Sequence, residues 1–216
     1  MPDVKKSGVP VNAFGLPRRR FGDVLLFGVT IVELTILVLF TPTFTIGDWI
    51  YVLQHLMVLV IALTRGAPQA QDNSLRILIA VAASYAYPYA QVIYLRWVPG
   101  MPAWPAIGLF LITFAACLSI FSLVSLGRLF GVRPAWRGLV TAGPYRLVRH
   151  PMYLSYVLGD IGYNLQEWNA GTLLTVIAGW ISLIVRIRAE DRVLSQDARW
   201  PTYAATVRYR LIPGLW

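Results

Sequence analysis

Cysteine and histidine are scarce in this sequence. The single cysteine, Cys117, lies inside an apolar run, so the chain forms no intrachain disulfide and no cysteine-based metal site. The two histidines, His55 and His150, lie in different segments, and neither is surrounded by a cluster of metal-ligand residues. Glycine-rich nucleotide loops, the zinc-protease helix motif and the Gly-x-Ser-x-Gly elbow are missing as well. The sequence therefore predicts a protein without a bound metal ion and without these soluble-enzyme sites.

Charged residues are also few. They make up 13% of the 216 residues, whereas 57% are hydrophobic and the mean hydropathy is +0.60. The apolar fraction is too high for a disordered chain. Soluble domains are about 25% charged, so the low charged fraction disfavours a water-soluble globule. Nineteen Lys and Arg oppose ten Asp and Glu, which gives a net charge of +9. On an apolar chain this excess predicts contact with an anionic membrane surface rather than with nucleic acid.

Long apolar runs predict the fold class. A membrane-spanning helix needs about 20 mostly apolar residues. Four runs approach or meet that length, namely Phe21–Phe40, Trp49–Leu63, Leu75–Val98 and Trp104–Leu126. A further pair, Met152–Leu165 and Thr172–Ile187, is interrupted by polar residues and predicts a helical hairpin whose first member is short for a full span. We therefore expect an all-α, polytopic membrane bundle of five to six apolar helices.

The cations predict how this bundle is organised. Residues 1–20 form a basic N-terminus that we expect to be retained rather than cleaved as a signal peptide. Residues 21–126 carry the four N-terminal spans, and residues 127–216 carry the hairpin (152–187) and a C-terminal tail. With both termini cytoplasmic, 18 of the 19 Lys and Arg fall on inside segments, and Arg96 is the exception. We expect a multi-pass protein with both termini in the cytoplasm.

Some ionisable residues lie in the interior of the apolar runs rather than near their ends. Glu33 lies within the first run, His55 in the second and Asp160 in the hairpin. Ionisable groups inside a bilayer are costly and are candidates for a functional role. The alternative for Glu33 and His55 is an interhelical hydrogen bond that holds the bundle together. Asp160 fits a cavity group and a helix-packing partner equally well.

Residues whose side chains suit catalysis or ligand binding gather between Leu126 and Trp216. Gly143-Pro144 is a turn signal, and Arg149-His150 stands directly before Pro151, which is suited to the first turn of a helix. A helix N-terminus exposes free N–H groups and favours an anion. Arg186 and Glu190 are four residues apart, so they share one face of a helix.

Together these blocks resemble the isoprenylcysteine carboxyl methyltransferase family and its relatives among membrane methyltransferases. The family pattern is Leu-Val-x-x-Gly-x-Tyr, then Arg-His-Pro-x-Tyr, an acidic pair about 40 residues later, and a final apolar-Pro. The matching residues here are Leu139-Val140, Gly143, Tyr145, Arg149-His150-Pro151, Tyr153, Glu190-Asp191 and Ile212-Pro213. The resemblance covers about the last 90 residues.

The resemblance implies that S-adenosylmethionine (SAM) is held between the two blocks at the cytoplasmic face, without a Rossmann domain. It implies that Arg186 and Glu190 form the catalytic pair. Arg186 would face the methyl acceptor, and Glu190 would also hold the cofactor. The implied cofactor-binding residues are Arg137, Gly138, Leu139, Val140, Tyr145, His150, Pro151, Met152, Tyr153 and Glu190. Two departures concern the acceptor side. The second acid is Asp191 rather than Glu, and the Tyr-x-x-Tyr that follows the acidic pair in the family pattern is Tyr203-Ala-Ala-Thr206 here.

The chemistry of these side chains is compatible with SAM. Glu190 can accept hydrogen bonds from an ammonium group or from ribose hydroxyls, and His150 with the helix N-terminus can serve the SAM carboxylate. Tyr145 and Tyr153 can pack on adenine or contact the sulfonium. An acceptor carboxylate is already ionised at neutral pH and needs no general base, and Arg186 could orient it.

The sequence leaves several functions open. The first is carboxyl methylation of a lipophilic, isoprenylcysteine-like acceptor within the lipid bilayer, and N-methylation of a phospholipid headgroup competes with it. A membrane reductase that uses NADPH is a further alternative, because sterol reductases are similar near their C-termini. A transporter or scaffold that retains the fold is the non-enzymatic alternative. No nucleic-acid partner and no obligate protein partner is expected.

Overall fold

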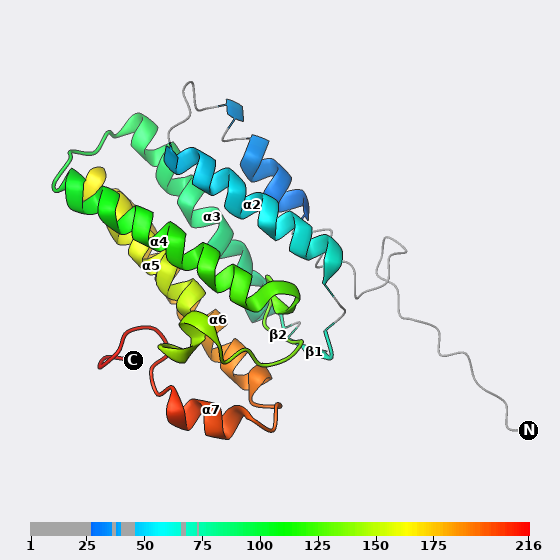
Figure 1. Ribbon diagram of the computed structural model, residues 1–216. Helices are drawn as coiled ribbons and strands as arrows, with labels where there is room; N and C mark the ends of the chain where they lie inside the picture. Colours follow the sequence, from blue (N-terminus) through cyan, green and yellow to red (C-terminus); the bar gives the residue numbers. More distant parts are fainter. Residues whose placement is uncertain (1–26, 36–37, 40–45, 66–67, 73) are drawn as a thin grey trace, which may run out of the picture.

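Figure 1 shows a computed structural model of the chain, which describes residues 27–35, 38–39, 46–65, 68–72 and 74–216. Most of these residues are helical, which confirms the all-α class. Residues 27–35 are helical, and the elements that follow are α2 (Ile46–Thr64), β1 (Ala70–Gln71), α3 (Leu75–Trp97), α4 (Pro105–Leu126), η1 (Gly127–Leu129), β2 (Ala135–Trp136), η2 (Gly143–Arg146), α5 (Pro151–Gln166), α6 (Ala170–Leu194) and α7 (Trp200–Thr206). The basic segment 1–20 lies outside the described residues.

Three helices in the described part of the chain are long and apolar enough to cross a membrane. These segments are Leu75–Leu95, Pro105–Leu129 and Ala170–Leu194, and a shorter apolar helix covers Val52–Thr64. The expected runs Leu75–Val98 and Trp104–Leu126 correspond to α3 and α4. The total of five to six spans stays a prediction.

The expected hairpin is present as α5 and α6. Asn169 caps the start of α6, because its side-chain oxygen accepts from the Gly171 N–H at 2.8 Å. Its side-chain amide donates to the Val98 carbonyl at 3.1 Å. The helix α6 continues past the expected end at Ile187 to Leu194. Polar side chains do not stop a helix that has good helix formers, so the apolar run underestimates its length. Arg186 and Glu190 therefore lie within the last turns of α6.

Glycines allow the long helices to pack closely. Helix α4 packs along α5, and α3 packs along α6 (Figure 1). A side chain at Gly162 of α5 would meet the Gly108 carbonyl of α4 at 2.7 Å. On the other pair, a side chain at Gly179 of α6 would meet the Tyr87 ring of α3 at 2.6 Å. Both contacts set the distance between neighbouring helices.

Polar residues inside the bundle connect helices to one another. Asp160 of α5 accepts from the Tyr87 hydroxyl at 2.9 Å and from the Trp180 indole N–H at 2.8 Å. Asp160 is therefore a helix-packing partner that joins α3, α5 and α6. Glu33 and His55 lie 2.8 Å apart, which joins the helix at 27–35 to α2. The interhelical contact anticipated for these two residues is present.

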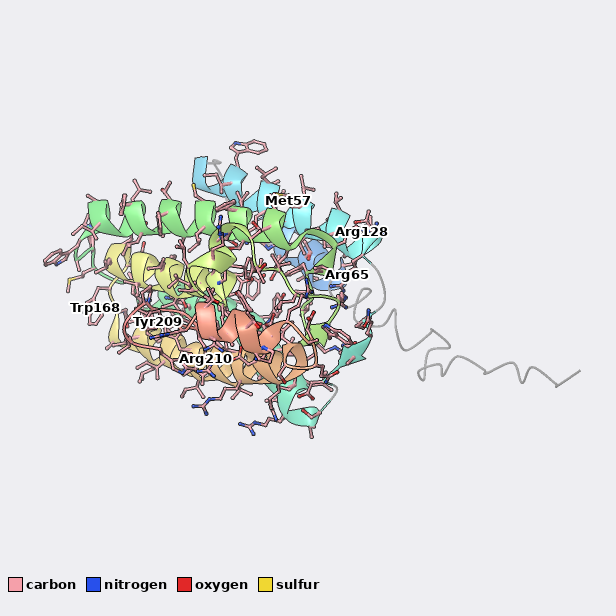
Figure 2. All side chains as sticks on the ribbon, turned by 60° about the horizontal axis from the view of Figure 1, so that its bottom comes forward. Met57, Arg65, Arg128, Trp168, Tyr209 and Arg210 are labelled. Carbon is pink, nitrogen blue, oxygen red and sulfur yellow. The ribbon has the colours of Figure 1, made fainter. Side chains whose placement is uncertain are left out.

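Two loops meet at one end of the bundle. Strands β1 and β2 pair antiparallel there. Arg65 donates to the Phe130 carbonyl at 3.1 Å, and Arg128 donates to the Thr64 carbonyl at 2.6 Å. Figure 2 shows Arg65 and Arg128 together at this end and Trp168, in the hairpin turn, at the other. The structure thus gathers these cations at one end, and the assignment of that end to the cytoplasm stays a prediction.

We predict that Gly162→Ala lowers the thermal midpoint of the detergent-purified protein. The new methyl group would meet the Gly108 carbonyl and the Ile112 backbone at 3.0 Å or less, and overpacking of this kind costs about 1–3 kcal/mol. Gly159→Ala is the matched control on the same helix, because its methyl group meets only the Ala115 side chain at 3.8 Å. The control should be neutral or slightly stabilising. Equal midpoints for the two variants would contradict the close contact between α4 and α5.

Candidate functional site

A cavity lies between the start of α5, the end of α6 and the segment that links α4 to β2. Its empty volume, open mouth included, is about 540 Å³. Apolar side chains and Gly131 form part of its wall. The polar residues that line it, tyrosines included, are Tyr85, Arg133, Tyr145, His150, Tyr153, Tyr156, Arg186 and Glu190. Both motif blocks found in the sequence therefore contribute to one cavity.

The turn at Gly143 brings Tyr145 to this cavity. Gly143 has a φ of 59°, and a side chain there would run into the Ser125 hydroxyl of α4. The turn continues as η2, in which Tyr145 is buried, and the Tyr203 hydroxyl of α7 donates to the Tyr145 carbonyl at 2.8 Å. Burial, together with the nearby Glu190 carboxylate, raises the pKa of Tyr145. The Tyr145 hydroxyl therefore stays protonated at neutral pH and is a hydrogen-bond donor rather than a base.

Two neighbouring carboxylates of α6 hold two rings at the start of α5. The Tyr153 hydroxyl donates to Glu190 Oε2 at 2.8 Å, and His150 Nε2 lies 2.7 Å from Asp191 Oδ1. The two rings also contact each other, with centroids 5.8 Å apart. The Arg-His-Pro-x-Tyr block and the acidic pair are thus direct partners in the fold.

Asp191 is the centre of an ion cluster that the sequence reasoning did not assign to the site. Its Oδ2 lies 2.6 Å from Arg210 Nε and 3.4 Å from Arg149 Nη1. The backbone of the C-terminal tail lies beside the residues that precede α5. The Arg149 N–H donates to the Tyr209 carbonyl and the His150 N–H donates to the Arg210 carbonyl, both at 2.9 Å. Figure 2 shows Tyr209 and Arg210 on this tail segment. The only sequence signal for this role was the acid beside Glu190.

Arg186 is buried in the wall of the cavity. Its Nη1 donates to Ser84 Oγ at 2.6 Å and its Nη2 donates to the Val132 carbonyl at 2.9 Å. The guanidinium carbon lies 5.2 Å from the centre of the Tyr153 ring and 5.9 Å from that of Tyr85. Arg186 is thus held by α3, by the first turn of α5 and by the segment before β2, so its position is fixed from three sides.

The structure brings together some of the expected cofactor residues and not others. Tyr145, His150, Met152, Tyr153 and Glu190 line the cavity. Arg137, Gly138, Leu139, Val140 and Pro151 are not among the lining residues.

Two of the residues outside the lining have other contacts. The Arg137 guanidinium occupies the space beside Gly131 that a side chain there would take. Leu139 packs with Tyr203 and Val207 in a small core under α7. These contacts place the Arg137–Val140 stretch behind the cavity wall.

Comparisons with known proteins support the sequence pattern. Residues 106–196 match the model of the isoprenylcysteine carboxyl methyltransferase (ICMT) family. The cobalt-zinc-cadmium resistance protein CzcN of Cupriavidus metallidurans is 38% identical over 71 residues, which is 32% of this chain and 32% of that protein. The match thus spans about a third of the length of this curated relative.

No solved structure matches the chain. Among the residues that the structure describes, no group of three His, Cys, Asp or Glu is placed to hold a metal ion. The family match includes α4, the Arg-His-Pro-x-Tyr block and the acidic pair. The resemblance predicted from the motifs is therefore confirmed over residues 106–196, where the chain is similar to the ICMT family.

Proposed function

We propose that the protein is an integral membrane methyltransferase that uses SAM and methylates the carboxylate of a lipophilic, isoprenylcysteine-like acceptor. The observation that carries this proposal is the convergence of both motif blocks on one cavity. Glu190 and Arg186 of α6 face that cavity together with Tyr145, His150 and Tyr153. The family match over the same residues supports a methyl transfer.

The lining of the cavity fits SAM by its chemistry. Tyr145 and Tyr153 offer aromatic faces for adenine or a sulfonium, and Glu190 can accept from an ammonium group or ribose hydroxyls. When bound, SAM supplies an electrophilic methyl group on its sulfonium. The Tyr153 hydroxyl holds the Glu190 carboxylate in place for this task.

The charges of the cavity favour an anionic acceptor. Arg133 and Arg186 line it against the single carboxylate of Glu190. The Nε of Arg186 is buried and makes no hydrogen bond within the described structure, so it is a donor that an acceptor carboxylate could use. A carboxylate is ionised at neutral pH, so the residues need only align it and exclude water.

Phospholipid N-methylation fits the cavity less well. An ammonium acceptor must first lose a proton, which calls for a nearby base. Glu190 already accepts a hydrogen bond from Tyr153, and Asp191 is held by His150, Arg149 and Arg210. Glu190 is assigned to the cofactor in this proposal and Asp191 is not among the residues that line the cavity, so neither carboxylate is placed to take that proton.

We predict that Glu190→Ala and His150→Ala each abolish SAM binding, measured by calorimetry on protein purified in detergent. Both changes remove a polar group that lines the cavity. Glu167→Ala is the control, because Glu167 is exposed at the hairpin turn. Thermal midpoints without ligand report whether each variant is folded. Wild-type affinity in either variant would remove that residue from the cofactor site, and stabilisation of the wild type by NADPH instead of SAM would favour the reductase alternative.

We predict that Arg186→Lys keeps SAM affinity but lowers turnover about tenfold or more. A lysine keeps the charge but loses the planar arrangement of donors, and a charge-assisted hydrogen bond contributes about 1.5–3 kcal/mol. Arg188→Lys is the matched control, since Arg188 is exposed on the same helix. Calorimetry gives the affinity and a labelled-methyl assay gives the turnover. Equal turnover in the two variants would contradict a role of Arg186 at the acceptor.

The acceptor class is tested by product identification. Purified protein is given SAM with a labelled methyl group and either prenylcysteine acids or total membrane lipid. We expect label in a methyl ester, which base hydrolysis releases as methanol. Label that resists hydrolysis and stays on a headgroup amine would show the phospholipid alternative instead.

A further inference from the structure

Asp191 has a different environment from its neighbour Glu190. Glu190 lines the cavity, whereas Asp191 is buried behind it, and its carboxylate is surrounded by nitrogen donors. Oδ2 receives Arg210 at 2.6 Å and Arg149 at 3.4 Å, and Oδ1 lies 2.7 Å from His150 Nε2. Asp191 reaches the cavity only through the ring of His150.

The surroundings of Asp191 decide which nitrogen of His150 carries its proton. A carboxylate in contact with two guanidinium groups is ionised, and an ionised carboxylate only accepts hydrogen bonds. His150 must therefore donate through Nε2. The side chain of His150 makes no cap to the helix that follows it, so the ring is available for this contact.

The second ring nitrogen of His150, Nδ1, takes the opposite role to Nε2. The His150 ring is 3% exposed and packs on Tyr153. In a neutral imidazole only one of the two ring nitrogens carries a proton. Nδ1 is then left without a proton and acts as a hydrogen-bond acceptor.

We infer that Asp191 is a positioning residue: it holds His150 in the tautomer with a proton on Nε2 and so provides the cavity with an acceptor nitrogen at Nδ1. In combination with the proposed function, His150 then receives a donor of SAM, an ammonium or a ribose hydroxyl, rather than its carboxylate. This differs from the expectation drawn from the sequence. Asp191 also holds the 208–211 segment beside the start of α5 through Arg210 and Arg149.

The tautomer can be read directly by nitrogen NMR on the full chain labelled with ¹⁵N-histidine, because the sequence has only two histidines. His150→Gln assigns the signals. We expect His150 in the wild type, without ligand, to show a pyrrole-type Nε2 and a pyridine-type Nδ1. A protonated Nδ1 in the wild type, whether as the other tautomer or as an imidazolium, overturns the inference. This measurement needs no cofactor and no turnover.

Three variants separate positioning from packing. Asp191→Asn presents an amide that can donate to Nε2, so we expect the proton to move to Nδ1 and SAM affinity to fall about tenfold or more. Asp191→Glu keeps the carboxylate and should restore the wild-type tautomer and most of the affinity. Arg210→Gln releases the tail but leaves the pair of Asp191 and His150 intact, so the tautomer should not change.

The outcomes are distinct from a failure of the proposed function. Asp191→Asn with an unchanged tautomer and unchanged SAM affinity overturns the inference, and so does a tautomer change in Arg210→Gln that equals the one in Asp191→Asn. A wild-type protein that shows the expected tautomer but does not bind SAM contradicts the cofactor proposal and leaves the role of Asp191 toward His150 intact.

Discussion

The contact between the end of α6 and the first turn of α5 carries the candidate site. Glu190 receives the Tyr153 hydroxyl and Asp191 pairs with His150, so adjacent residues of one helix fix two rings of the other. The groups are buried or partly buried, and a buried donor or acceptor without a partner is costly. Because the rings form part of the cavity wall, the same two bonds that hold the helices together also set the shape of the cavity.

Close helix packing makes this contact possible. Gly162 lets α5 approach α4, and Gly179 lets α6 approach α3, so two closely packed pairs of helices form the bundle. Arg186 depends on that assembly, since its hydrogen-bond partners, Ser84 and Val132, come from α3 and from the segment before β2. A buried guanidinium without these partners would be strongly destabilising. Arg186 is therefore both a wall of the cavity and a link between separate parts of the chain.

Much of the site could be predicted because its residues follow local rules. The Gly143-Pro144 turn, the helix that starts at Pro151 and the shared helical face of Arg186 and Glu190 depend on neighbours in sequence. The prediction was less complete where contacts are distant. Asp160 could not be assigned between a cavity and a packing role until Tyr87 and Trp180 were placed beside it. For Asp191 the sequence predicted only a place in the acidic pair, because its partners His150 and Arg210 lie far from it along the chain.

The sequence by itself determined that the protein is helical, apolar and basic, and which residues have the chemistry for a cofactor site. Those properties follow from composition and from spacing along single helices, which the 3.6-residue period fixes. Only the tertiary structure decided that Asp191 pairs with His150 and that Arg186 is held by Ser84 and Val132. Such pairs join residues 41 to 102 positions apart, and their formation depends on how helices pack, which no local rule sets.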